Sequence, residues 1–309
     1  MIKWEYKIVQ KFSYLKNRRV QMTQEMYGRL LKEIRLSRKM TLHTLSSDII
    51  SVSQLSKFEN GITNLTIDRL LLLLDKLNVT YEEFFTEAKA YQRPEIERVS
   101  ALISKKYIEQ DVEALKTLYT EQNMTYEKTN IYFYKLNAIL VASVLEDLTE
   151  EIFVTKEMRN ELAEYLFGVE KWRYYEVVLF GNSMRALTTD MLKIVTTELM
   201  KSPVLSVQIA KSKQMRIQIL YNVALTMIEK KELDFAKLLI EETRSSLEKD
   251  ETLILERIKL HYLNGYYMFK SGKTEAGKQL MKESINTFQL YNCIHLAQNF
   301  EAHYKASIQ

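Results

Sequence analysis

Apolar residues recur at the spacing of an amphipathic helix along most of this chain of 309 residues. Near the start, Tyr27, Leu30, Leu31 and Ile34 make up one face of a predicted helix. From residue 95 onward, long stretches with the same periodicity alternate with short polar breaks. The pattern therefore predicts an all-α fold.

Residues 22–86 are divided by helix-capping signals into five short predicted helices. A Ser or Thr before an apolar run can accept a backbone hydrogen bond at the helix start, and a Glu or Gln three residues later completes a capping box. A glycine after the last turn is a common helix end. The signals are Thr41, Ser51 with Gln54, Thr66, Thr80 with Glu83, and Gly61 as a helix end. Five short helices in this stretch are typical of a small DNA-binding domain.

Residues 87–95 (EAKAYQRPE) form a predicted linker or hinge, because a residue that precedes a proline is disfavoured in a helix. Pro94 is one of only two prolines in the chain.

Residues 1–21 form a basic extension with six Lys or Arg and one Glu. Three interpretations remain open. The segment is a membrane-surface helix, a DNA-binding arm, or sequence upstream of a true start at Met22. The third is preferred, because Arg18-Arg19 could be encoded AGG-AGG, which resembles a ribosome-binding site placed before that methionine.

A repeat with a spacing of 41 residues lies in the C-terminal part of the chain. Ala224 corresponds to Gly265, and Ala236 corresponds to Gly277. Two antiparallel helices pack closely only where both have small side chains at the crossing, so the pattern predicts tetratricopeptide-like helix pairs. We assign residues 96–309 to this repeat domain, with a plain helical bundle as the alternative.

A more degenerate repeat unit is predicted from Glu161 through Met184. Its second helix is expected to contain Trp172 and Tyr175, and Pro203 is expected in the loop before the next unit.

The composition argues against an enzyme. Seven glycines and two prolines are about 3% of the residues, against about 12% on average, and sheets and phosphate-binding loops need more. We find no HExxH, CxxC, Walker or GxSxG motif. We therefore predict no catalytic residue, no metal and no cofactor.

The cysteine count and the hydropathy bear on location. The single cysteine, Cys293, cannot form an internal disulfide, which is typical of a reducing cytosol. No apolar run reaches the length of a membrane span. We therefore predict a cytoplasmic protein with no membrane partner.

The segment Ser51–Gly61 (SVSQLSKFENG) has the composition of a recognition helix. Short or amide side chains at its first turn can reach base edges in the major groove, while Leu55 and Phe58 point inward. Glu59 is expected to bind a nearby helix end or Arg35. The predicted DNA contacts, including cations and polar groups for phosphates, are Arg29, Arg35, Arg38, Lys39, Ser51, Ser53, Gln54, Lys57, Thr63 and Asn64.

The charge of this region favours a dimer. Residues 22–86 hold eight cations and eight anions, but residues 22–64 hold six and four, and residues 65–86 hold two and four. Because phosphate binding depends on positive charge, the cations must lie on one face, with Asp68, Asp75, Glu82 and Glu83 on the other. A homodimer with two recognition helices would double the phosphate contacts on a two-fold related operator.

Four motifs together resemble the Rgg/GadR/MutR regulators of Gram-positive bacteria. SVSQLSKFENG and LTIDRLLLLLDKLNVTYEEFF resemble their Cro/C1-type helix-turn-helix. YLFGVEKWRYYEVVLFGNSMR, from Tyr165 to Arg185, and YLNGYYMFKSGK, from Tyr262 to Lys273, resemble the C-terminal part of the family. The resemblance extends from Met22 to about Tyr304.

The resemblance implies a cytosolic homodimeric transcription regulator controlled by a short peptide pheromone in the repeat domain. Arg185 suits a peptide carboxylate and Asn222 suits a peptide backbone. Two alternatives remain: Arg185 pairs with an internal Glu, and Asn222 caps a repeat. The full predicted peptide-binding set is Asn182, Arg185, Tyr221, Asn222 and Tyr266.

Two departures from the family pattern are visible. Some members carry a cysteine that links the two DNA-binding domains, and this chain has Ile67 at that place. The second helix begins Thr41-Leu-His43-Thr44, not with the usual Thr-Gln, which puts the glutamine contact to phosphate in doubt.

The predicted function is thus a DNA-binding transcription regulator controlled by a peptide pheromone. The alternatives are a family member that needs no peptide, and a repeat scaffold that binds a partner protein.

Overall fold

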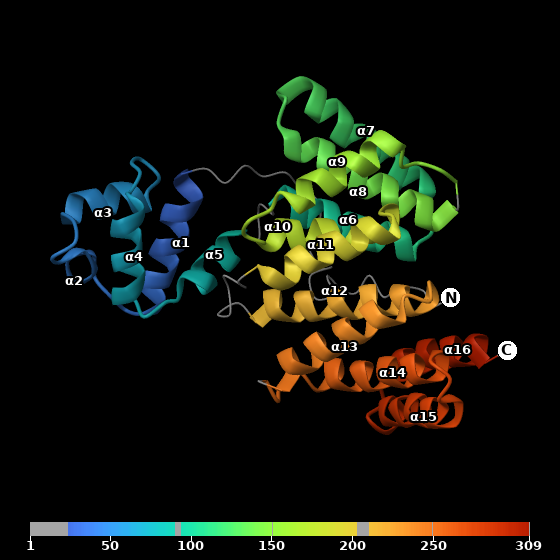
Figure 1. Cartoon of the computed structure of the whole chain (residues 1–309). Helices are drawn as coiled ribbons and strands as arrows, with labels where there is room; N and C mark the ends of the chain where they lie inside the picture. Colours follow the sequence, from blue (N-terminus) through green and yellow to red (C-terminus); the bar gives the residue numbers. More distant parts are fainter. Residues whose placement is uncertain (1–23, 90–93, 150, 203–209, 249, 309) are drawn as a thin grey trace. The chain divides into compact units, whose positions relative to one another are not determined.

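The computed structural model describes residues 24–89, 94–149, 151–202, 210–248 and 250–308 (Figure 1). Within these ranges every regular element is helical, which confirms the predicted all-α fold. The described chain divides into two compact units, with the boundary between Arg98 and Val99. The basic extension and Pro203 lie outside the described residues.

The N-terminal unit contains the five short helices expected from the sequence. They are α1 (Gln24–Ser37), α2 (Leu42–Ser46), α3 (Val52–Glu59), α4 (Ile67–Lys76) and α5 (Tyr81–Lys89). Fully or almost fully buried side chains of all five helices and of the turn after α4 form one core: Leu31, Leu45, Leu55, Phe58, Leu73, Leu74, Leu77 and Phe84. The α5 helix extends to Lys89 and α6 begins at Glu95, so helix occupies part of the predicted linker.

The capping signals act largely as predicted. The Thr41 hydroxyl accepts a hydrogen bond from the Thr44 amide, at 3.0 Å. Ser51 and Gln54 form a capping box, in which each side chain accepts a hydrogen bond from the backbone amide of the other residue. Gly61 has a φ of +71°, in the left-handed region where glycine is not strained. Thr66 is the N-cap of α4 but makes no capping hydrogen bond with its side chain.

The C-terminal unit is an array of helices. The first part contains α6 (Glu95–Ile108), α7 (Val112–Thr129), α8 (Tyr132–Thr149), α9 (Lys156–Phe167), α10 (Tyr174–Ser183), the 3₁₀ turn η2 (Met184–Ala186) and α11 (Thr189–Lys201). The second contains α12 (Ala210–Glu229), α13 (Leu233–Glu248), α14 (Ile254–Lys270), α15 (Thr274–Leu290) and α16 (Ile294–Ile308). Consecutive helices pack as pairs, such as α7 with α8, α12 with α13 and α14 with α15 (Figure 1).

The small residues of the 41-residue repeat lie where the paired helices touch. A Cβ atom added at Gly277 would come within 2.6 Å of the Gly265 carbonyl oxygen, and one at Gly265 within 2.8 Å of the Gly277 oxygen. Ala224 and Ala236 are both fully buried in the preceding pair. This close approach is the physical reason for the repeat that the sequence shows.

One prediction about the degenerate repeat unit is wrong. Trp172 precedes α10 and is not part of it, although Tyr175 does lie in that helix. The Trp172 ring packs edge-on against Phe180, with ring centroids 5.7 Å apart. Trp172 is buried in the core although it lies outside the helix.

Candidate DNA-binding surface and repeat-domain site

The α3 helix presents a polar face to solvent and an apolar face to the core. Ser53, Gln54 and Lys57 are exposed, while Leu55 and Phe58 are buried. This division confirms the predicted inward-pointing residues and leaves the polar side chains free to face a ligand.

The capping box restricts what Gln54 can recognise. Its Oε1 atom accepts the Ser51 amide at 3.2 Å, so the side-chain NH₂ group remains available to donate. While this box holds, one lone pair of the Gln54 oxygen is already engaged, so Gln54 offers mainly its NH₂ donors to a base edge.

Arg35 must be removed from the predicted phosphate contacts. Its Nε donates to Glu59 Oε1 at 2.6 Å, its Nη2 donates to Glu59 Oε2 at 2.7 Å, and its Nη1 donates to the Met40 carbonyl. The two side chains are 7% and 2% exposed. The guanidinium is therefore buried between α1 and α3. Arg35 is the partner of Glu59, which was one of the two roles predicted for Glu59.

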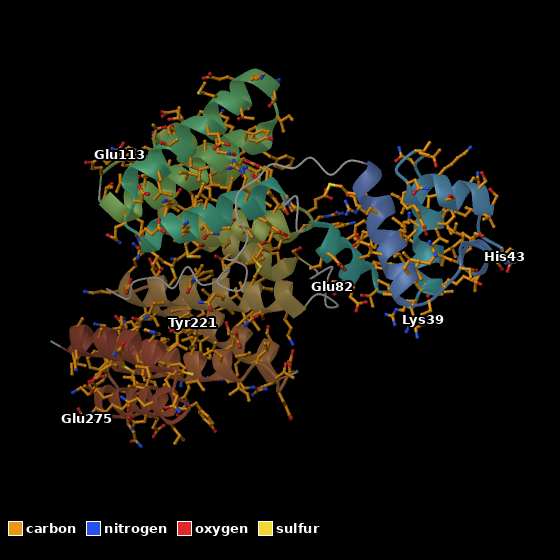
Figure 2. All side chains as sticks on the ribbon, turned by 180° about the vertical axis from the view of Figure 1, so that it is seen from behind. Lys39, His43, Glu82, Glu113, Tyr221 and Glu275 are labelled. Carbon is orange, nitrogen blue, oxygen red and sulfur yellow. The ribbon has the colours of Figure 1, made fainter. Side chains whose placement is uncertain are left out.

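The remaining predicted phosphate contacts lie at the surface or partly at the surface. Arg29, Arg38, Lys39 and Asn64 are exposed, and Thr63 is half-buried. Arg29 forms an exposed ion pair with Glu33, at 3.3 Å, which a phosphate could replace at little cost. Figure 2 shows Glu82 and His43 at opposite ends of the N-terminal unit. Arg38 and Glu83 line the same surface pocket, so the predicted separation of the cations from the acidic residues does not hold for Arg38.

Arg185 lies in the η2 turn and is ion paired with Asp147 of α8. The Asp147 side chain is 1% exposed and that of Arg185 is 35% exposed. Tyr107 of α6 donates its hydroxyl to Asp147 Oδ2 at 2.9 Å. The alternative of an internal carboxylate partner for Arg185 is therefore supported. The ion pair is with an aspartate, and the charge of Arg185 also acts on Glu229, where it opposes the rise in pKa that burial causes.

The two predicted amides have partners within their own helices. Asn182 Nδ2 donates to the Val178 carbonyl at 2.7 Å, in α10. Asn222 Oδ1 accepts from Gln218 Nε2 at 3.0 Å, in α12. Because Asn222 lies inside a helix, the alternative that it caps a repeat is wrong.

Tyr221 and Tyr266 do not line an open surface. They are 6% and 4% exposed, and the Tyr266 ring packs edge-on against His303 with centroids 4.7 Å apart. The sequence predicted that both tyrosines line a groove, but both are buried, and the Tyr266 ring joins α14 to α16 through His303.

The buried His303 makes the stability of this region sensitive to acid. Burial lowers its pKa from 6.5 to about 4, and Tyr262 donates or accepts a hydrogen bond at its Nδ1 atom, at 2.7 Å. The unfolded chain takes up a proton near pH 6.5, and the folded chain does so only near pH 4. Acidification between these values therefore favours the unfolded state.

We expect His303→Asn to remove about 2 kcal/mol of the stability difference between pH 7 and pH 4.5. Urea denaturation followed by circular dichroism measures the free energy of unfolding. His295→Asn is the control, because His295 is exposed. Equal pH dependence in wild type and His303→Asn would contradict the assignment.

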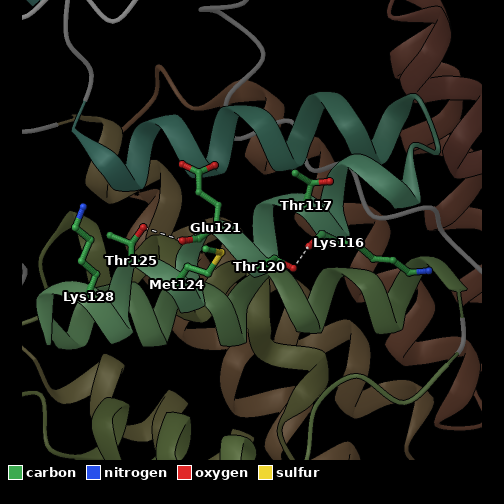
Figure 3. A pocket seen from close by; sticks show the side chains of 7 residues that line it. All are labelled: Lys116, Thr117, Thr120, Glu121, Met124, Thr125 and Lys128. Carbon is green, nitrogen blue, oxygen red and sulfur yellow. Dashed lines mark hydrogen bonds between the residues drawn. The ribbon is translucent and has the colours of Figure 1, made fainter.

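A shallow pocket of about 630 Å³ lies along α7 (Figure 3). Its lining comes from this helix alone: Lys116, Thr117, Thr120, Glu121, Met124, Thr125 and Lys128. The threonine hydroxyls donate to backbone carbonyls one turn earlier, so they present methyl groups to the pocket.

Asp147 and Tyr107 were not found from the sequence. They are separated from Arg185 by 38 and 78 positions, and no local spacing links them. Within the described ranges, no helix is both long enough and apolar enough to cross a bilayer, and no group of three potential metal-ligating side chains comes together.

Comparison with known proteins identifies both units. Residues 115–302 match the sequence model described as HTH-type transcriptional regulator Rgg, C-terminal domain. Residues 31–84 match a helix-turn-helix family. The first match alone covers more than half of the chain.

Solved structures agree with these matches. The Streptococcus dysgalactiae SHP pheromone receptor Rgg2 is 28% identical, with a TM-score of 0.78, and the alignment covers 91% of this chain and 99% of that one. PrgX in its complex with cCF10 is 18% identical, with a TM-score of 0.72, and the alignment covers 92% and 99%. At that identity PrgX supports the fold alone. The chain thus belongs to the Rgg family of helix-turn-helix transcriptional regulators, and it is not an enzyme.

Proposed function

We propose that this regulator binds an operator as a homodimer. We further propose that it is controlled by a short peptide bound to the C-terminal unit, which is called the repeat unit below. The observation that carries the DNA-binding part is the α3 helix, with Ser53, Gln54 and Lys57 exposed over a buried Leu55 and Phe58. The near-neutral charge of residues 22–86 favours two recognition helices over one, because each module alone has few phosphate contacts.

The peptide part is supported by the likeness to a protein described as a pheromone receptor and by the chemistry of Arg185. A partly exposed guanidinium can bind a carboxylate at the peptide C-terminus or on an acidic side chain. Asn222 keeps its NH₂ donors for a peptide backbone, because its oxygen accepts from Gln218. A peptide would regulate the dimer by binding one of its arrangements more tightly than another.

Selection of random duplex DNA on the full-length chain tests the operator and the dimer together. We expect enrichment of an inverted repeat whose half-sites are about one helical turn apart, since two-fold protein symmetry is mirrored in the site. Enrichment of a single half-site would contradict the dimer, and no enrichment would contradict DNA binding.

Lys57→Ala is expected to weaken binding to the selected duplex by about tenfold if Lys57 contacts a phosphate, and to lower the salt slope by about one. Fluorescence anisotropy at several salt concentrations measures both. Lys105→Ala is the matched control, because Lys105 is an exposed lysine of α6 in the other unit. Unchanged affinity in Lys57→Ala would remove Lys57 from the interface.

Selection of random octapeptides by display on the full-length chain tests the peptide part. We expect wild type to enrich peptides with a carboxylate, and Arg185→Ala to lose them while keeping its affinity for the selected DNA. Loss of both activities would indicate that Arg185 has a structural role.

A further inference from the structure

Three side chains from distant parts of the sequence meet inside the repeat unit. Asp147 of α8 is buried, is ion paired with Arg185 of η2, and accepts the hydroxyl hydrogen of Tyr107 of α6. A carboxylate removed from water in this way depends on its partners, because burial without them is unfavourable.

Arg185 spans the boundary between this interior cluster and the surface. Its guanidinium has five N–H donors in a planar fork, and its Nη1 atom is paired with Asp147 Oδ1. Since the side chain is 35% exposed, a ligand in solvent can approach the guanidinium. The charge available to that ligand is reduced, because Asp147 is ion paired with the cation and Glu229 also interacts with it electrostatically.

We propose that Asp147 is an internal competitor for Arg185, which sets how strongly the repeat unit binds peptides that carry a carboxylate. This inference rests on the proposed peptide function and adds the residue that tunes it. A peptide carboxylate must share Arg185 with Asp147 or replace it. In either case Asp147 becomes more dependent on Tyr107.

Tyr107 gives the cluster a connection toward the DNA-binding unit. Burial raises the pKa of Tyr107 above its ordinary value of 10, so at neutral pH the phenol stays protonated and can donate. Tyr107 lies at the C-terminal end of α6. The boundary between the two units falls near the N-terminal end of the same helix, between Arg98 and Val99. A change at Asp147 therefore acts on the helix that joins the two units covalently.

The test uses one octapeptide enriched by display on wild type, in two forms that differ by a single carboxylate-to-amide change. Asp147→Asn is expected to bind the carboxylate form about tenfold more tightly than wild type does, with little change for the amide form. Calorimetric titration of the full-length chain measures both affinities. The control is Glu113→Gln, which removes the same charge from a side chain that is 83% exposed.

The outcomes separate this inference from the function on which it rests. If wild type binds the carboxylate form and Arg185→Ala does not, but Asp147→Asn binds no more tightly, the competitor role is overturned and the peptide function stands. If no peptide is enriched, both are overturned. Should Asp147→Asn fold poorly by circular dichroism, Asp147→Ser provides a second neutral variant with the same expected result.

Tyr107→Phe tests the connection through α6. It removes the hydrogen bond to Asp147 without changing any charge, so the carboxylate peptide should still bind. We expect the effect of that peptide on DNA affinity to shrink at least about threefold, because the response no longer reaches α6 through this bond. A full peptide effect in this variant would overturn the connection.

Discussion

Glu59→Leu is expected to lower the free energy of unfolding of the DNA-binding unit by about 3–5 kcal/mol, because it leaves the Arg35 guanidinium buried without its counter-ion. Two short hydrogen bonds join these side chains, at 2.6 and 2.7 Å, and they are almost inaccessible to water. An arginine guanidinium does not lose its proton in proteins, so the Arg35 cation cannot avoid this cost by becoming neutral. The variant therefore retains a charge that nothing compensates.

Hydrogen exchange of the backbone amides in α1 and α3 measures this effect within the full-length chain. Arg35→Met should have a loss similar to that of Glu59→Leu, and the double variant should lose far less than the sum, since both charges are then absent. Arg29→Ala is the control, because Arg29 and Glu33 form an ion pair on the same helix with 76% and 63% exposed side chains. Its expected loss is about 0.5 kcal/mol or less. Additive losses in the double variant would show that the pair is not coupled.

The same ion pair bears on DNA recognition. Glu59 is in the last turn of α3 and Arg35 is in the last turns of α1, so the pair fixes the recognition helix against its support. Arg35 also donates to the Met40 carbonyl in the turn that leads to α2. A residue that looked like a phosphate contact in the sequence thus has a different role, which is to hold the surface that carries the contacts.

Features encoded by neighbouring residues could be predicted from the sequence. The capping box of Ser51 and Gln54 and the left-handed Gly61 depend on at most four adjacent positions, so local patterns predict them. The 41-residue repeat could be found because small side chains recur at corresponding positions. Gly265 and Gly277 lie at a close helix crossing, and Ala224 and Ala236 are buried in the preceding pair.

Features that depend on packing between distant segments could not be predicted. Tyr221 and Tyr266 have the amphipathic character of groove residues, and only the position of the neighbouring helices decides that their rings are buried. The cluster of Tyr107, Asp147 and Arg185 combines three segments whose order along the chain gives no sign of contact. The sequence motif identified Arg185, but it did not identify the buried partner Asp147.

Gly28 is a second feature whose role cannot be predicted from the local sequence pattern. A glycine inside a helix usually weakens it by about 1 kcal/mol relative to alanine, so the sequence alone favours replacement. In the structure a Cβ atom at Gly28 would lie 1.9 Å from the Phe58 carbonyl oxygen and 2.8 Å from its carbonyl carbon. Both atoms belong to the α3 backbone, which cannot move aside as a flexible side chain could. The absence of a side chain at Gly28 allows the backbones of α1 and α3 to approach this closely.

Gly28→Ala is therefore expected to lower the free energy of unfolding of the DNA-binding unit by about 2 kcal/mol or more, despite the gain in helix propensity. It should also weaken binding to the selected duplex, because relief of the overlap displaces α3. Hydrogen exchange in α1 and α3 measures the first effect and fluorescence anisotropy the second. Gly168→Ala is the matched control, since its added Cβ would lie 3.5 Å from the nearest atom, at ordinary contact distance. A Gly28→Ala protein with wild-type protection and DNA affinity would show that α1 and α3 can separate without cost, and the close helix crossing would then not be what positions the recognition helix.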